Sequence, residues 1–147
     1  KLPFSDQSFD IVTNRHGDYD AAELQRVLKS EGLFLTQQVG AENDRELVEL
    51  LLPQLTEVPY PKQYLEVKKA ELLEHGFEIL ESGEVRRPIR FFDVGALVWF
   101  ARIIEWEFPG FSVESCFEQL LEAQKRIERD GLLEGSIHRF YIVAKEK

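Results

Sequence analysis

The sequence predicts an α/β fold, in which helices pack on the faces of a β-sheet. Short β-branched or apolar runs alternate along the chain with runs at helical spacing. Turn residues separate these runs, and the resulting order of elements is β-α-β-α-α-β-α-α-β. The 147 residues, 44% of them hydrophobic, suffice to bury one core of ordinary size.

The beginning of the chain predicts a strand, a helix and a second strand. Residues Phe9–Asn14 form a short β-branched run that is apolar at its centre. Asp20 is placed to cap the following helix, with Glu23 three residues later in a capping-box arrangement, and Gly32 is expected to end that helix. Gly32–Val39 starts with a continuous apolar run, which is typical of a buried parallel strand.

Two helices and a third strand are expected in the middle of the chain. Asn43 has the character of a helix start, and Pro53 ends the apolar face that follows it. Tyr64–His75 is expected to form the next helix. Phe77–Glu81 alternates at period two, as a half-buried strand does. Val85–Phe92 would continue this strand or pair with it, although Pro88 favours a break.

The C-terminal part predicts two further helices and a final strand. Asp93–Trp106 is almost wholly apolar at helix length, and a helix that is apolar all round is usually buried. Ser112 is expected to cap a longer helix, which Gly131 ends. Ile137–Val143 is the expected last strand.

The composition excludes several classes of protein. The formal net charge of -9 disfavours broad binding to nucleic acid or to an anionic membrane, because phosphate binders need a basic surface. A single cysteine, Cys116, excludes an internal disulfide and a zinc site built from cysteines, and no metal site is expected. No apolar stretch could span a bilayer and no signal peptide is visible, so we expect a cytoplasmic protein. Because the chain holds no methionine, we expect it to be a piece of a longer protein.

Three blocks of the sequence resemble those of one enzyme family. Residues Leu2–Val12 read LPFSDQSFDIV, similar to the family form LPFxDxSFDxV. Residues Arg26–Leu35 read RVLKSEGLFL, similar to RVLKPGGxFL, with Ser30 and Glu31 in place of the usual Pro-Gly. Residues Glu71–Ile79 resemble the joint between a helix and the sixth strand. In this order the blocks resemble the class I S-adenosylmethionine-dependent methyltransferases. Three other stretches, Asn14–His16, Thr36–Gly40 and Phe91–Ala96, resemble the branch of that family called type 11.

The resemblance implies the C-terminal half of a Rossmann-like methyltransferase sheet, with strands four to seven and an antiparallel last strand. The family's glycine-rich donor loop has no counterpart, because the chain contains no Gly-x-Gly. The complete protein would use S-adenosylmethionine as its cofactor to methylate a small-molecule acceptor, whereas this chain alone is expected to be inactive. Residues 1–147 would form one partial domain, with a helical insertion at 86–131 that walls the acceptor pocket. The alternative is a non-catalytic binding or assembly module that keeps half of the fold.

The resemblance also assigns residues to the donor. Leu2, Pro3 and Phe4 would flank its adenine, and the alternative is a hydrophobic plug in a loop. Asn14 and Arg15 stand at the carboxyl end of the first strand, where open α/β sheets bind their ligands. They would lie beside the donor's methionine or the acceptor, and the alternative is a polar turn before the next helix.

The remaining candidates concern the acceptor. His16 is the candidate catalytic base, because imidazole titrates near neutral pH, and the alternative is a solvated loop histidine. Gln37 and Gln38 end an apolar strand, where they would either bind a polar acceptor or satisfy loop backbone. Phe92 and Trp99 would wall the acceptor pocket, unless their helix simply packs on the sheet.

The first strand, Phe9–Asn14, also predicts a partner. In the complete fold it would neighbour a strand that this chain lacks, so its backbone groups would form an open edge. We therefore expect the chain to cover this edge by forming a homodimer, by swapping a segment or by rearranging. The residues leave open which acceptor atom is methylated and whether a base takes part.

Overall fold

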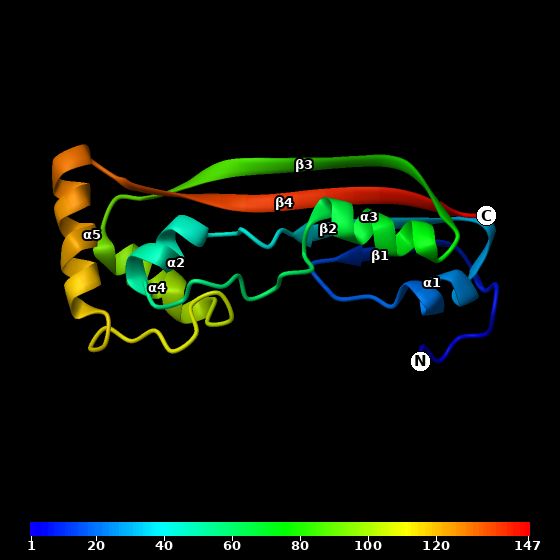
Figure 1. Ribbon diagram of the computed structural model, residues 1–147, viewed down its shortest axis with the longest axis horizontal. Coiled ribbons are helices and arrows are strands. Elements are labelled where there is room, and N and C mark those ends of the chain that lie inside the picture. The colour runs from blue at the N-terminus through cyan, green and yellow to red at the C-terminus, as the bar shows by residue number, and fades with distance from the viewer. The chain divides into compact units, whose positions relative to one another are not determined.

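The computed structural model describes residues 1–147 and contains nine helices and strands in the predicted order (Figure 1). None of the helices has the length and apolar composition needed to cross a bilayer. The elements are β1 (Phe9–Arg15), α1 (Ala21–Val27), β2 (Leu28–Val39), α2 (Arg45–Leu51), α3 (Leu65–Glu74), β3 (Phe77–Phe91), α4 (Val94–Ile103), α5 (Phe117–Asp130) and β4 (Leu133–Glu146).

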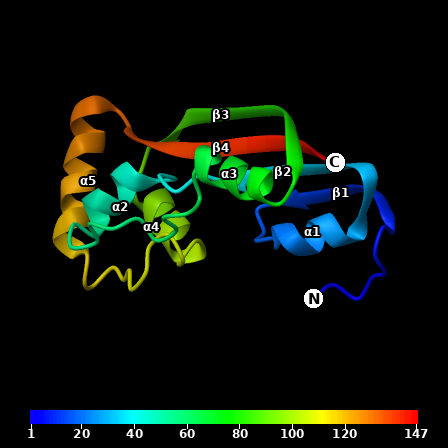
Figure 2. The same cartoon turned by 45° about the vertical axis from the view of Figure 1, so that its right-hand side comes forward.

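The four strands form one sheet in the order β1-β2-β4-β3, which can be followed in Figures 1 and 2. β1 pairs with β2 in parallel, and β2 pairs with β4 in antiparallel orientation. The last strand of the sequence therefore lies between two earlier ones. This confirms the predicted α/β sheet with an antiparallel final strand.

The chain divides into two compact units. Unit 1 comprises residues 1–41, 61–85 and 139–147, and unit 2 comprises residues 42–60 and 86–138. Unit 2 thus takes in the expected insertion at 86–131 together with a second segment, 42–60. β3 and β4 contribute residues to both units.

The core of unit 1 lies between one face of the sheet and two helices. Leu24 of α1 and Leu72 of α3 pack in one cluster with Phe34 of β2 and with Phe140 and Ile142 of β4. These side chains are at most 4% exposed. Because both helices contribute to the same cluster, they cover the same face of the sheet.

The core of unit 2 is built by three helices. Leu47 of α2, Leu97 of α4 and Leu120 of α5 belong to one buried cluster. Helix α5 is strongly amphipathic, and it ends at Gly131, which adopts the left-handed conformation as expected (φ 81°). Gly135 of β4 lies so close to α2 that a Cβ there would meet the Cγ of Leu47 at 2.6 Å.

Two expected boundaries near the second strand are wrong. Asp20 caps α1 as predicted, but the helix ends at Val27 and the strand assignment begins at Leu28 rather than Gly32. The pairing with β1 shifts register inside this stretch. Glu31 there has a φ of 67°, so a turn residue lies inside what is otherwise a strand.

Three further boundaries differ from the expectation. Pro88 does not break β3, because β3 is an edge strand and an edge tolerates a residue without an N–H. The cap of α2 is Asp44 rather than Asn43. α5 begins at Phe117, after a turn in which the Ser112 hydroxyl accepts the N–H of Ser115.

Candidate functional site

The carboxyl ends of β1 and β2 meet at one edge of the sheet. Arg15, the last residue of β1, pairs with Gln37 of β2. The next backbone N–H, that of His16, donates to the carbonyl of Gln37 at 2.9 Å. Five predicted site residues are therefore neighbours here, and this is the edge at which open α/β sheets bind ligands. They are Asn14, Arg15, His16, Gln37 and Gln38.

A buried polar network joins the two strands at this edge. The Gln38 amide nitrogen donates to Asn14 Oδ1 at 2.6 Å and to the Gly17 carbonyl at 3.0 Å. The Thr36 hydroxyl also donates to Asn14 Oδ1, at 3.0 Å. Because Gln38 is only 3% exposed and its NH2 group is already used, this geometry favours the role in which it satisfies loop backbone. Gln37, on the opposite face, is exposed.

His16 leaves the strand in an unusual conformation. Its φ is 54°, in the left-handed region that a residue with a side chain adopts at a cost. Partial burial, followed by the charges of Arg139 and Arg15, lowers the pKa of the imidazole below its ordinary value. His16 is therefore neutral at pH 7, the form in which an imidazole can accept a proton. Its catalytic role stays a prediction.

A side chain of α3 contacts Tyr19 and fixes the loop that follows His16. The Tyr19 ring packs on Phe34 with centroids 5.0 Å apart, and the Lys68 ammonium lies 4.9 Å from the Tyr19 centroid. Glu71 accepts from this buried ammonium at 2.9 Å. Burial, with the nearby carboxylates, raises the pKa of the Tyr19 phenol. Tyr19 thus anchors the loop that carries the candidate residues.

The three residues expected to flank adenine lie elsewhere. The Phe4 ring packs edge-on against Phe9, at the amino end of β1. The Leu2 N–H donates to Glu23 at 2.7 Å, and Arg26 donates to the carbonyls of Leu2 and Phe4. The seven residues of β1 span about 20 Å, so the structure does not bring Leu2, Pro3 and Phe4 together with Asn14 and Arg15. Their contact with a donor stays a prediction.

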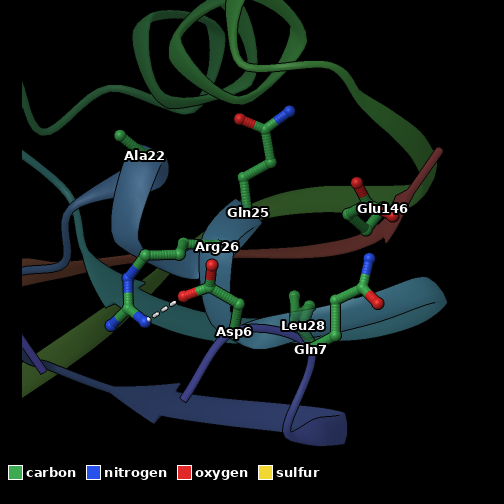
Figure 3. Close-up of a pocket in the computed structure, with 7 residues that line it drawn as sticks. All are labelled: Asp6, Gln7, Ala22, Gln25, Arg26, Leu28 and Glu146. Carbon is green, nitrogen blue, oxygen red and sulfur yellow. Dashed lines mark hydrogen bonds and ion pairs between the residues drawn. The ribbon is translucent and has the colours of Figure 1, made fainter. Parts of the chain in front are cut away.

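One hollow of about 560 Å³ opens at this amino end, and Figure 3 shows its lining. Arg26, its most prominent cation, is engaged by Asp6 and Glu23, each at 2.8 Å. The hydrogen bond from Arg26 lowers the pKa of Glu23 to about 2. Since these charges satisfy one another, the hollow is a weaker candidate than the carboxyl edge. It is lined by Asp6, Gln7, Ala22, Gln25, Arg26, Leu28 and Glu146.

The two predicted aromatic residues belong to unit 2. Phe92 is 67% exposed and Trp99 is 66% exposed, whereas Leu97 and Ala101 form the buried side of α4. The expectation that this apolar helix is buried all round is therefore wrong. Trp106 is also more than half exposed. The aromatics are accessible to a ligand, and their role in an acceptor pocket stays a prediction.

Sequence reasoning missed a buried polar cluster in unit 2. The Asn43 amide donates to Asp44 Oδ2 at 2.6 Å and lies 3.4 Å from Glu107 Oε1. Its carbonyl oxygen accepts the backbone N–H of His138 at 3.1 Å. All four residues are at most 6% exposed. Glu107 and His138 are far from Asn43 and Asp44 in the sequence, so only the fold brings the four residues together. No group of three or more His, Cys, Asp or Glu side chains in the structure could hold a metal ion.

Comparison of the fold with solved structures finds several that are similar. A presumed methyltransferase from Bacillus halodurans superposes with a TM-score of 0.60 at 19% identity, over 99% of this chain and 68% of that protein. The chain has a methyltransferase fold. The YcgJ protein from Bacillus subtilis superposes with a TM-score of 0.54 at 21% identity, over 100% of this chain and 68% of that protein. Neither the family models nor the curated proteins match this sequence.

A third solved structure shares the fold at still lower identity. It is a functionally unknown protein from Deinococcus radiodurans, with a TM-score of 0.54 and 12% identity. The chain spans only 51% of its length. At such identities the comparisons establish the fold, and the activity has to be argued from the site.

Proposed function

We propose that this chain is the C-terminal part of an S-adenosylmethionine-dependent methyltransferase that acts on a small-molecule acceptor. The observation that carries the proposal is the sheet order β1-β2-β4-β3 with an antiparallel β4, in a fold shared with the Bacillus halodurans protein. The polar residues at the carboxyl edge of β1 and β2 support it, because this edge is the ligand side of an open α/β sheet.

The residues at this edge fit one part of such a donor. Asn14 is held by Gln38 and Thr36 on the covered face, and Arg15 is exposed on the opposite face, so either residue suits the polar methionine end of the molecule. The chain has no Gly-x-Gly loop to cradle the rest. We therefore propose that the chain alone does not turn over substrate.

Methyl transfer mainly requires that the protein align the donor and the acceptor. S-adenosylmethionine supplies an activated methyl group when it is bound. The fixed Asn14 and Gln38 would preserve the geometry of the edge, which is the main requirement of a one-step displacement. The neutral His16 would accept a proton from an acceptor that must lose one. The exposed Phe92 and Trp99 would contribute apolar surface toward the acceptor.

Calorimetric titration with S-adenosylhomocysteine tests this function. The compound is added to the 147-residue chain and, in parallel, to a chain extended at its N-terminus by the preceding encoded residues. We expect binding heat from the extended chain only. Tight binding by the short chain would contradict the proposal that its donor site is incomplete.

The alternative is a non-catalytic binding or assembly module. Absence of binding in both titrations would select it. In either case we propose a cytoplasmic protein that dimerises through β1, which is an edge strand of the sheet. Sedimentation at several concentrations tests the dimer, and a monomer at all of them would refute it.

A further inference from the structure

The hollow at the amino end of β1 has one side on which every donor is already used. There the Arg26 guanidinium directs all five of its N–H donors into hydrogen bonds of 2.8–3.2 Å. The acceptors are the carboxylates of Asp6 and Glu23 and two backbone carbonyls. Two carboxylates match the one positive charge, and no N–H of this arginine is left to bind an anion. The hollow is therefore poorly suited to an anion.

The other side of the hollow carries a carboxylate without a cation. Glu146 of β4 is half-buried, and its carboxylate makes no ion pair or hydrogen bond. In Figure 3 it lies on the same side as the Gln7 amide, across the hollow from Arg26. The side-chain amides of Gln7 and Gln25 are also without a hydrogen-bond partner. A half-buried carboxylate beside unused amides favours a cation as the occupant.

The backbone fixes Gln7 at the rim of the hollow in a strained conformation. Its φ is 50°, in the left-handed region that a residue with a side chain seldom adopts. The Gln7 N–H donates to the carbonyl of Arg26 at 2.9 Å, and the Ser8 N–H donates to that of Val27 at 2.8 Å. These two bonds hold the residue in place while its side-chain amide stays unused. Strain that the surrounding structure enforces is common at binding sites.

We propose that the hollow binds a small primary ammonium ion through Glu146, Gln7 and Gln25. A primary ammonium has three N–H donors and no acceptor. The Glu146 carboxylate and the side-chain carbonyls of the two glutamines supply three acceptors. Ala22 and Leu28, which also line the hollow, offer apolar contacts for a short carbon chain.

This binding site goes beyond the proposed function. The volume of about 560 Å³ lies within the usual range for small-molecule sites. The hollow lies at the amino end of β1, whereas the candidate residues for methyl transfer lie at the carboxyl end. An ammonium ion bound there would therefore take no direct part in the reaction.

Titration of the 147-residue chain with n-butylammonium chloride tests the site by NMR. The side-chain NH2 signals of Gln7 and Gln25 are followed at neutral pH, at constant ionic strength against sodium chloride. We expect saturable shifts of both signals, because both amides would contact the ion. Glu146→Gln should weaken the binding about tenfold, since it removes the charge and keeps the shape.

Two further variants separate the site from general effects of charge and folding. Gln7→Gly removes the side-chain amide and relieves the backbone strain, so it should stay folded and bind the ion severalfold more weakly. Glu114→Gln is the matched control, because Glu114 is an exposed residue of unit 2 whose carboxylate makes no ion pair. It removes the same charge and should leave the affinity unchanged.

Three other results would overturn the site. A non-saturable response, or an unchanged affinity in Glu146→Gln, would rule out binding by that carboxylate. Equal binding of tetramethylammonium, which has the charge but no N–H donor, would rule out recognition through hydrogen bonds. A saturable response to sodium acetate in place of butylammonium would show that the hollow takes an anion. None of these results depends on whether the chain binds S-adenosylhomocysteine.

Discussion

The two faces of the sheet in unit 1 differ sharply in their surroundings. On one face, Phe34, Phe140 and Ile142 are at most 1% exposed beneath α1 and α3. On the other face, Ile11 is 56% exposed and Leu80 is 50% exposed. Both faces carry apolar side chains, but α1 and α3 cover only one of them, and parallel strands normally have both faces covered. The comparison teaches that the stability of this chain comes from one face, whereas the other face is available for contacts.

Matched leucine truncations should give the largest difference between the faces. Leu72→Ala empties a fully buried position of α3 against the sheet and should cost about 2–5 kcal/mol of unfolding free energy. Leu80→Ala removes a half-exposed side chain from the open face and should cost less than about 1 kcal/mol. Urea unfolding of both variants measures the difference. Equal losses would show that the open face is covered in solution.

Two adjacent glutamines of β2 allow the covered and the open face of the sheet to be compared for polar side chains. Gln38→Ala removes the donor to the Gly17 carbonyl and one of the two donors to Asn14 Oδ1, and it should cost about 1–3 kcal/mol. Gln37→Ala changes an exposed residue of the open face and should stay within about 0.5 kcal/mol of the parent. Thermal unfolding compares the two, and a similar loss in both would contradict the buried network.

The turn inside β2 offers a stabilising change. Glu31 has a φ of 67°, where glycine is favoured, and it pairs with Lys145 at 2.8 Å on the surface. Glu31→Gly should relieve about 1–2 kcal/mol of backbone strain and lose less than about 1 kcal/mol with the ion pair. The net expectation is a small rise in the unfolding midpoint.

The neighbouring glycine provides the control for that change. Gly32→Ala should destabilise the chain, because a Cβ there would meet the Lys29 carbonyl at 2.7 Å. If Glu31→Gly lowered the midpoint as Gly32→Ala does, the strain at residue 31 would be refuted.

The smallest expected effect concerns acid stability near α1. The hydrogen bond from Arg26 holds the pKa of Glu23 at about 2, below its ordinary value of 4.5. A carboxyl with a lowered folded-state pKa adds stability above 4.5, and this stability is lost as the pH falls from 4.5 toward about 2. Glu23→Gln should flatten the pH dependence of the unfolding midpoint in this window. An unchanged profile would show that the pair contributes nothing in solution, which is common for surface pairs.

Much of the fold follows from local sequence signals. The nine elements, the cap at Asp20 and the glycine stop at Gly131 each depend on residues within a few positions of one another. The place of Pro88 inside β3 could not be predicted in the same way, because it depends on β3 being an edge strand. The exposure of Trp99 also escaped prediction, since the apolar composition of α4 suggests burial on all sides.

The candidate site was predictable only where it follows the ends of strands. Asn14 and Gln38 come together because β1 and β2 are parallel neighbours, which the order of elements suggests. Leu2 and Phe4 lie at the other end of β1, because Arg26 donates to their carbonyls and Phe9 packs on the Phe4 ring there. The charge of Arg139 acts on His16 because β4 pairs with β2, and no local pattern near residue 16 predicts that pairing.

The central position of β4 determines when the sheet can form during synthesis of the chain. β3 joins the sheet only through β4, and the contact between Lys145 and Glu31 closes a separation of 114 positions. A ribosome delivers β4 after the other three strands, so the sheet cannot close until β4 has emerged. Contacts of such long range also slow folding. Because β4 lies between β2 and β3, loss of β4 would divide the sheet in two rather than remove an edge strand.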